Sequence, residues 1–105
     1  MATTGADRPF GPVVFETAIW LATGGSWHFV SLPPPDADDI LEQVGAGGPG
    51  FGSVRVSVEL GGSRWQTSIF PDSRRGTYVL PIKKAVRTAE QVGAGDVVTV
   101  TLTLL

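Results

Sequence analysis

One six-residue sequence, Glu-Gln-Val-Gly-Ala-Gly, occurs twice in this chain, at residues 42–47 and 90–95, and it constrains the fold more than any other feature. The surrounding residues correspond as well, because segment 15–20 matches segment 65–70 in residue character at every position. Self-similarity of this kind is typical of a duplicated structural unit. A chain of 105 residues has room for one domain, so both copies must share it.

The duplication predicts two pseudo-repeats, residues 13–60 and 63–105, within a single barrel domain spanning residues 13–105. A unit of about 45 residues cannot cover its own apolar face, so two copies related by a pseudo-twofold axis would close one core. Residues 1–12 precede the first copy and are expected to be a flexible N-terminus. Two further matches support the alignment: Phe29-Val30 with Tyr78-Val79, and Leu32-Pro33 with Leu80-Pro81.

Alternation of apolar and polar residues predicts the strands. Val54, Val56 and Val58 point to one side and Arg55 and Ser57 to the other, as in a strand with one buried face. Six segments read this way, so each half contributes three strands to a mainly β fold. The predicted strands are residues 13–21, 27–32, 53–60, 64–70, 77–80 and 97–105.

One short helix is expected in each half, between its second and third strands. Asp36 can cap a helix over residues 37–44, and Pro81 suits the first position of a helix over residues 81–92. Each half then has the order β-β-α-β, and together they predict a six-stranded pseudobarrel with two short capping helices. The glycine-rich residues 45–52 are expected to form a loop, a linker or a lid.

Four segments carry a resemblance to a known family: Phe15-Glu16-Thr17-Ala18-Ile19, Trp27-His28-Phe29-Val30-Ser31-Leu32-Pro33, Trp65-Gln66-Thr67-Ser68-Ile69 and segment 76–87. Through them the chain resembles the bacterial domain-of-unknown-function family 1905 over about residues 13–104. That resemblance implies a double-split β-barrel and brings no established activity. The second half is also similar, more distantly, to the swapped-hairpin barrels of AbrB and MazE type, which close a barrel from two chains. In those proteins a basic residue commonly follows the strand glycine, whereas Thr77 follows Gly76 here.

Charge is distributed unevenly, although the net charge is only −2. Segment 74–87 holds five basic residues and no acid, whereas segment 36–42 holds four acids and no base. The molecule should therefore have one basic and one acidic pole, which suggests head-to-tail association into a homo-oligomer. The basic residues are Arg74, Arg75, Lys83, Lys84 and Arg87, and the acids are Asp36, Asp38, Asp39 and Glu42.

The basic helix face is the strongest candidate for binding, and an anionic ligand or an acidic protein partner suits it. The alternative, which is the more common case, is that these basic residues are simply the solvent-exposed face of an amphipathic helix. Nucleic acid is a less favoured partner because the chain has no basic footprint along its whole length. Aromatic side chains beside the basic residues could form a stacking platform. The candidate binding residues are Lys83, Lys84, Arg87, Arg74, Arg75, Tyr78, Trp65 and Thr67.

Two other function classes remain open. A small-molecule barrel or an enzyme of unknown reaction could gather His28, Asp72, Tyr78 and Lys83 at one barrel mouth, and it requires a pocket of roughly 300 Å³ or more. The other class is a purely structural or interaction domain without a ligand. No local motif identifies catalytic residues, so they stay unknown at this stage.

Composition excludes several classes of chemistry. The chain has no cysteine and one histidine, which removes disulfides, iron–sulfur clusters and Cys- or His-rich metal sites. No cofactor or metal is expected. No apolar run is long enough to cross a membrane, and the N-terminal residues lack the apolar stretch of a signal peptide. A cytoplasmic protein is therefore expected.

Overall fold

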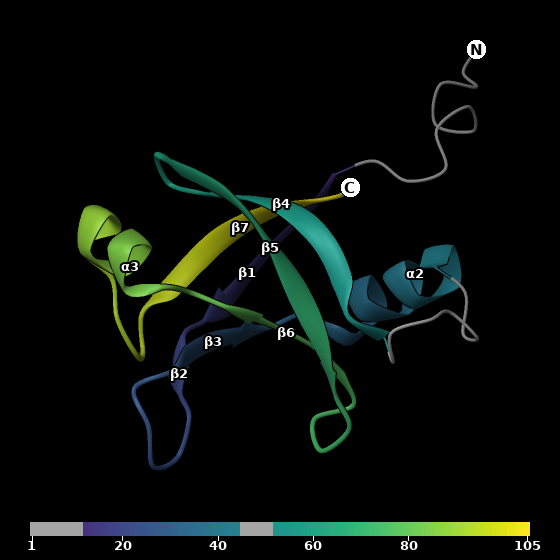
Figure 1. Ribbon diagram of the computed structural model, residues 1–105, viewed down its shortest axis with the longest axis horizontal. Coiled ribbons are helices and arrows are strands. Elements are labelled where there is room, and N and C mark those ends of the chain that lie inside the picture. Colours follow the sequence, from purple (N-terminus) through teal and green to yellow (C-terminus); the bar gives the residue numbers. More distant parts are fainter. Residues whose placement is uncertain (1–11, 45–51) are drawn as a thin grey trace.

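A computed structural model describes residues 12–44 and 52–105 of the chain and is mainly β (Figure 1). The predicted flexible N-terminus, apart from Pro12, and the predicted loop 45–52, apart from Gly52, lie outside the described residues. The elements are β1 (Val13–Ala18), β2 (Trp20–Leu21), β3 (His28–Ser31), α2 (Pro34–Val44), β4 (Val54–Leu60), β5 (Ser63–Asp72), β6 (Thr77–Pro81), α3 (Lys84–Glu90) and β7 (Val97–Leu104).

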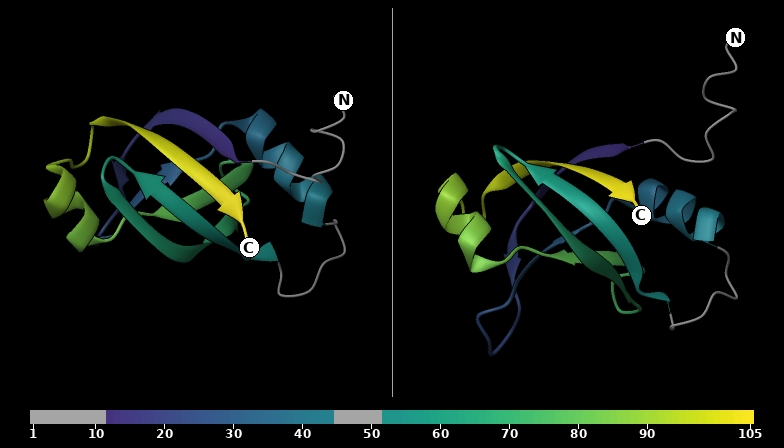
Figure 2. Two further views of the ribbon diagram at one scale, coloured as in Figure 1. Left: turned by 90° about the horizontal axis from the view of Figure 1, so that it is seen from above. Right: turned by 45° about the horizontal axis from the view of Figure 1, so that its top comes forward.

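The strands form one antiparallel sheet that curves into a nearly closed barrel. Its strand order is β1-β7-β4-β5-β6-β3-β2. The first and last strands of this order, β1 and β2, are consecutive in the chain and separated only by Ile19. A single bent segment therefore joins the two ends of the sheet. Figure 2 shows the sheet wrapped around the core, with α2 and α3 near opposite ends.

The sheet has seven strands instead of the predicted six, because the predicted strand 13–21 is broken at Ile19. There the chain leaves β7 and joins β3. The Ile19 amide donates to the Asp96 carbonyl (2.9 Å), and the Gly95 amide donates to the Ile19 carbonyl (2.8 Å). Alternation alone cannot reveal this break, since side chains on both sides of a bend keep the same pattern.

β5 changes partner in the same manner but without a break. Its residues 63–69 pair with β4, and its residues 70–72 pair with β6. β5 is therefore not paired with β6 over residues 63–69. The chain thus passes at two places, Ile19 and β5, from the strands paired around β4 and β7 to the strands paired around β3 and β6.

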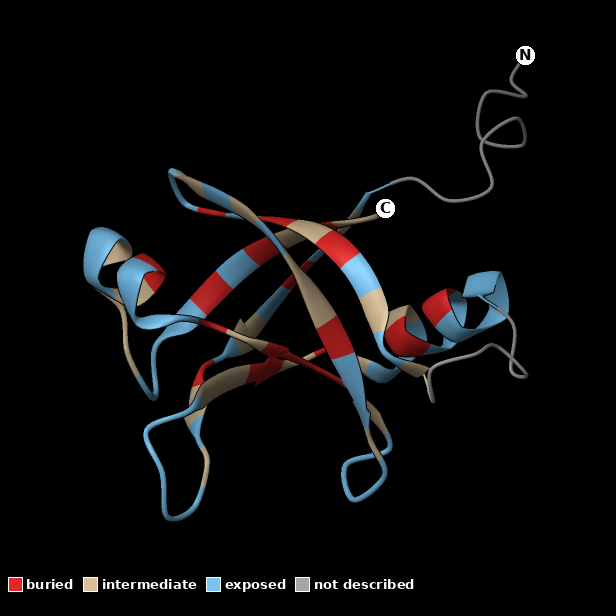
Figure 3. Ribbon diagram, in the orientation of Figure 1, coloured by how far each residue is buried: buried red, intermediate tan, exposed pale blue. Residues whose placement is uncertain are grey.

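The core is built as the alternation predicts. Val56, Val58 and Leu60 on β4 and Val100 and Leu102 on β7 are buried, while their neighbours face outward (Figure 3). Val30 and Leu80 lie opposite each other where β3 meets β6, and neither is accessible to solvent. Every buried residue among those described is apolar or Tyr78, so no buried charge has to be compensated.

Both helices begin at different residues from those predicted, and α3 also ends earlier than predicted. α2 begins at Pro34 instead of residue 37, because prolines fit a first helical turn whose amides have no partner anyway. Asp36 is then in the first turn, where burial and the nearby Asp39 raise its pKa.

α3 is shorter than the predicted 81–92. Pro81 is the last residue of β6, and the Ile82 amide donates to the His28 carbonyl (2.9 Å), which keeps the chain extended up to Lys83. Gln91 adopts a left-handed conformation (φ 58°) and ends the helix.

The backbone contacts of the two halves correspond. The Leu32 amide donates to the Tyr78 carbonyl (3.0 Å), just as the Ile82 amide donates to the His28 carbonyl. These contacts relate Leu32 to Ile82 and Val30 to Leu80. The predicted alignment of Phe29-Val30 with Tyr78-Val79 and of Leu32-Pro33 with Leu80-Pro81 differs from this relation by one or two residues. The residues matched in this alignment are all apolar or proline, so residue character does not distinguish alignments that differ by one or two positions.

Candidate functional site

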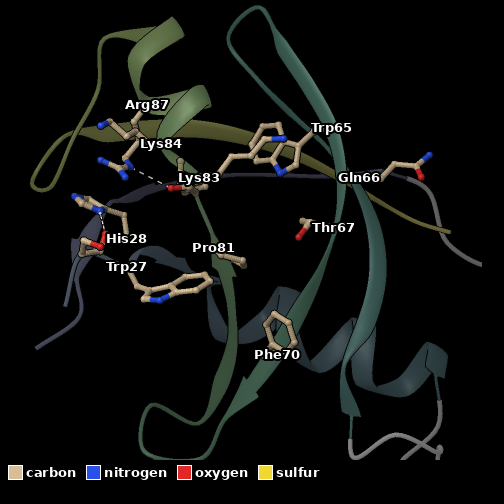
Figure 4. A pocket seen from close by; sticks show the side chains of 12 residues that line it. Trp27, His28, Trp65, Gln66, Thr67, Phe70, Pro81, Lys83, Lys84 and Arg87 are labelled. Carbon is tan, nitrogen blue, oxygen red and sulfur yellow. Dashed lines mark hydrogen bonds between the residues drawn. The ribbon is translucent and has the colours of Figure 1, made fainter. Parts of the chain in front are cut away.

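A cleft of about 450 Å³ opens where β5 separates from β6. We call it the basic cleft. Pro81 lies on its edge, at the end of β6, where β5 has already turned away to β4. Pro81 pairs with Phe29 on β3, while its other side, which faces β5, has no strand partner. A proline suits this place because it lacks the amide that would otherwise be left without a partner there. The lining residues are Ser26, Trp27, His28, Trp65, Gln66, Thr67, Phe70, Pro81, Ile82, Lys83, Lys84 and Arg87 (Figure 4).

Three cations line one wall of the basic cleft. Lys83 and Lys84 are exposed, and Arg87 is half-buried. The Arg87 Nε donates to the Ile82 carbonyl (3.1 Å), which fixes the guanidinium beside the start of α3. Neither ion pair within the described residues involves these side chains, and no carboxylate lines the cleft. The cleft therefore concentrates positive charge in a chain whose net charge is −2.

The opposite wall and the floor are aromatic. Trp65 and Thr67 lie on the inward side of β5, opposite Val58 and Val56, and Trp65 packs against the core. Trp27 is 64% exposed and Phe70 44% exposed, so both present ring surface to solvent. In Figure 4, Gln66 points away from the cleft, while Lys83 extends toward Trp65. The cleft thus combines flat apolar surfaces with a cationic rim.

His28 lies on the same cleft with a defined hydrogen bond. Its Nδ1 is 2.8 Å from the Ser26 carbonyl oxygen. A carbonyl can only accept, so Nδ1 carries the proton and Nε2 of the neutral ring keeps its lone pair. His28 and Lys83 are therefore neighbours, as the barrel-mouth hypothesis expected, whereas Asp72 and Tyr78 line a different pocket.

The structure brings five of the eight candidate binding residues together in the basic cleft. Arg74 and Arg75 lie in the turn between β5 and β6, away from α3. Tyr78 is buried, and burial raises the pKa of its hydroxyl. Nearness in sequence had grouped them, but β6 runs between the turn and the cleft and separates the two ends. The residues that meet are Lys83, Lys84, Arg87, Trp65 and Thr67.

Arg75 has partners of its own. Its guanidinium carbon is 3.7 Å from the centroid of the Trp20 ring, and its Nη1 pairs with Asp72 Oδ2 (3.1 Å). Burial raises the pKa of Asp72, but hydrogen bonds from Arg75 and from the Arg74 amide outweigh it, so the pKa is lowered overall. Arg75 therefore stabilises its turn and covers Trp20.

Seven of the residues that line the cleft were missing from the sequence-derived binding set: Ser26, Trp27, His28, Gln66, Phe70, Pro81 and Ile82. Trp27 follows the Gly24-Gly25-Ser26 turn, and an aromatic residue next to a tight turn is a usable signal of an exposed ring. Phe70 gave no such signal, since only the change of partner along β5 places it at the cleft.

Two classes of site receive no support within residues 12–44 and 52–105. No group of three His, Cys, Asp or Glu side chains there could hold a metal ion. Neither α2 nor α3 has the length and apolar character that would let a helix cross a membrane.

A family model described as "Domain of unknown function (DUF1905)" matches residues 15–102, which include every residue that lines the basic cleft. A search of curated proteins finds no match to the chain.

Proposed function

The chain belongs to the family DUF1905, and we propose that it is a binding protein whose basic cleft takes a small anion with a flat apolar body. The family description names no activity, so the proposal depends on the cleft itself. Its volume of about 450 Å³ lies within the usual range for small-molecule sites, roughly 300–1,000 Å³. The volume also exceeds the roughly 300 Å³ that a small-molecule barrel requires.

One observation carries the proposal: the corresponding turn in the first half forms without cations at these three positions. The Ala37 amide donates to the Pro33 carbonyl (3.0 Å), just as the Arg87 amide donates to the Lys83 carbonyl (3.1 Å). Positions 33, 34 and 37 in the first half therefore correspond to positions 83, 84 and 87 in the second. The first half builds the same turn into a helix with Pro33, Pro34 and Ala37.

Two of these cations have a local cost. Lys83 and Lys84 start a helix whose first turn has no acidic residue, where positive charge opposes the helix dipole, whereas Arg87 lies in its last turn, where a cation is favourable. Arg87 does serve the fold by donating to Ile82, but Lys83 and Lys84 have no such task among the described contacts. Lysines that disfavour the start of the helix, and that make no contact supporting the fold, are better explained by a binding role than by a merely solvated helix face.

The chemistry of the lining defines the ligand. A carboxylate, sulfate or phosphate group suits the ammonium groups of Lys83 and Lys84 and the free edge of the Arg87 guanidinium. The Trp27, Phe70 and Trp65 surfaces suit a flat or apolar body, because aromatic contact adds to the area that is buried. A ligand without either part would use only half of the cleft.

We also infer that the barrel is a double-split fold formed by duplication, with pseudo-repeats 13–60 and 63–105 in one domain. The repeated hexapeptide supports this, as does the correspondence of the hydrogen bonds at Leu32 and Ile82. The pairing of β4 with β7, and of β3 with β6, would then lie on the pseudo-twofold axis.

Catalysis is a second candidate, favoured by one observation. The hydrogen bond from Nδ1 to the Ser26 carbonyl leaves the Nε2 lone pair of His28 available as a general base. A ligand that is consumed on incubation with the protein, but not with His28→Gln, would indicate an enzyme. A ligand that is bound and recovered unchanged would support a binding role without catalysis.

Tryptophan fluorescence tests the proposal directly, since Trp27 and Trp65 line the cleft. The probes are pairs of similar shape and different charge: benzoate with benzamide, and adenosine monophosphate with adenosine. Each anion is expected to bind at least tenfold more tightly than its neutral partner, and added salt should reduce the difference. Both lysines are exposed, so Lys83→Glu with Lys84→Glu should fold and lower anion affinity at least tenfold.

Arg55→Glu is the matched control, because Arg55 is an exposed cation on β4 outside the basic cleft. It changes net charge as each lysine variant does and should leave anion binding unchanged. An equal loss with Arg55→Glu would show non-specific attraction, and no binding by any anion would leave only a structural or interaction domain. Either outcome would reject the proposed function.

A further inference from the structure

The outer surface of the barrel is apolar where polar residues are expected. Beside the basic cleft is a second hollow of about 400 Å³, and only apolar residues line it. It lies over β3, β6 and the end of β5, on the side of the sheet that faces away from the core. We call it the aromatic face. Its residues are Ala22, Trp27, Phe29, Phe70, Val79 and Pro81.

Rings on this face are stacked and accessible. Trp27 and Phe29 are nearly parallel (14°) with centroids 6.0 Å apart, and Trp20 continues the row at 5.0 Å from Phe29. The Arg75 guanidinium covers the far side of Trp20. Trp27, Phe70 and Pro81 also line the basic cleft, so the two sites form one continuous surface.

Most of the charged side chains around this surface are cations. Lys83, Lys84 and Arg87 lie at one end, and Arg74 and Arg75 lie in the β5–β6 turn (Figure 1). These are five of the eight Lys and Arg residues in the chain. β2, β3 and β6 contain no acid, and the one acid of β5, Asp72, is paired with Arg75.

We propose that the aromatic face and the basic cleft together bind single-stranded nucleic acid, an inference that rests on the anion-binding function proposed above. Such a strand is a polyanion with flat apolar groups at regular intervals. Its bases can stack on Trp27, Phe29 and Phe70 while its phosphates reach the flanking cations. A duplex keeps its bases stacked on each other and offers no ring surface to this face.

A second copy of the chain fits this surface less well. If two copies met through the aromatic face, their flanking cations would be brought together without acids to pair with them. The acids Asp38, Asp39 and Glu42 of another copy lie on α2, which carries no aromatic residue. Charge complementarity therefore favours a strand of nucleic acid over self-association.

Fluorescence anisotropy with 15-nucleotide oligothymidine and oligouridine tests the proposal, and a 15-base-pair duplex serves for comparison. Binding of a single strand should exceed that of the duplex at least tenfold. Between three and five phosphate contacts predict a slope of log K against log salt of about −2 to −3.5. The DNA and RNA arms show which strand is preferred, and binding of either supports the proposal.

Two variants act on the aromatic face at residues that do not line the basic cleft. Phe29→Ala removes a ring, and Ala22→Glu places a negative charge on the face. Each should lower strand affinity at least about fivefold. Anion binding by the cleft should remain as in the wild type for Ala22→Glu, whereas Phe29→Ala also removes the ring that stacks on Trp27 and is judged by strand affinity alone. Leu41→Glu, at an exposed apolar residue of α2, is the control and should change neither property.

The failures of the two proposals are distinguishable. If small anions bind but the oligonucleotides do not, or if the duplex binds equally well, the nucleic-acid proposal is wrong and the cleft function stands. If neither binds, both are wrong. A stable dimer in light scattering that Ala22→Glu dissociates would make the aromatic face an interface between copies, and would also overturn the proposal.

Discussion

The two walls of the basic cleft are held together by Glu90, and breaking that contact provides the sharpest test of the fold. Glu90, at the end of α3, accepts hydrogen bonds from the Gly62 amide (3.2 Å) and from the Ser63 hydroxyl (2.6 Å). These residues begin β5, which carries Trp65, whereas α3 carries Lys84 and Arg87. The contact therefore sets the position of the aromatic wall relative to the cationic wall.

Gly61→Ala disturbs this contact in two separable ways. Gly61 has φ +60°, and a left-handed conformation costs a residue with a side chain about 1–2 kcal/mol. The new methyl group would also fall on Oε1 of Glu90, so the carboxylate would have to move away from Gly62 and Ser63. Gly76→Ala is the matched control, because Gly76 has φ +68° and nothing within 4 Å of the added carbon.

Thermal unfolding followed by circular dichroism measures both variants. Gly76→Ala should lower the free energy of unfolding by about 1 kcal/mol, a loss of about 4–8 °C in Tm for a chain of this size. Gly61→Ala pays the same strain and loses the Glu90 contact as well, so its Tm should fall by roughly twice as much. Replacing glycine by alanine also reduces the conformational entropy of the unfolded chain, which stabilises both variants by the same amount. This effect therefore cancels when the Tm values of the two variants are compared.

The double variant decides between the two causes. With Glu90→Ala already present, Gly61→Ala should cost only what Gly76→Ala costs, since no carboxylate is left to displace. Gly61→Ala should also weaken anion binding in the cleft, whereas Gly76→Ala should not. Equal Tm losses for the two glycine variants, or an unchanged cost of Gly61→Ala in the Glu90→Ala background, would refute the reasoning.

Three further predictions follow from the same contacts. The Ser63 and Gly62 hydrogen bonds lower the pKa of Glu90, so the stability they provide is present at neutral pH and is lost as pH falls below about 4.5 through the lowered pKa. Glu90→Gln should therefore flatten the pH dependence of stability across that window, and an unchanged pH dependence would contradict this. Leu80→Ala should cost about 3 kcal/mol in urea unfolding with an unchanged m-value, because Leu80 is fully buried, and a loss under 1 kcal/mol would contradict this. Arg75→Ala should cost only about 0.5 kcal/mol and alter Trp20 fluorescence, and an unaltered spectrum would argue against the stacked guanidinium.

Sequence reasoning succeeded where one local pattern determines the outcome. Alternation along residues 54–60 and 97–104 predicted the buried sides of β4 and β7, because period two leaves only one way to bury valine and leucine together. It failed where distant contacts decide. Pro81 fits a first helical turn as well as a strand end, and only the hydrogen bond from Ile82 to His28 selects the strand.

The candidate site shows the same division. The cations of segment 74–87 were identified from charge alone, but charge could not separate Arg75, held by Asp72 and Trp20, from Lys83 and Lys84 in the cleft. Tyr78 looked like a binding residue beside them, and the strand buries it. Assigning each residue required the path of the chain through β6.

The position of the cleft follows from how the barrel closes, while its chemistry does not. β5 pairs with β4 over residues 63–69 and with β6 only over residues 70–72, so the edge of β5 that faces β6 is unpaired before residue 70, and the cleft opens there. The first half has the corresponding change of partner near Ile19. In the proposed duplication, Pro33, Pro34 and Ala37 correspond to Lys83, Lys84 and Arg87, so the turn into α2 forms without cations at these positions. Charge reversal at Lys83 and Lys84 should consequently lower anion affinity at least tenfold and leave Tm nearly unchanged.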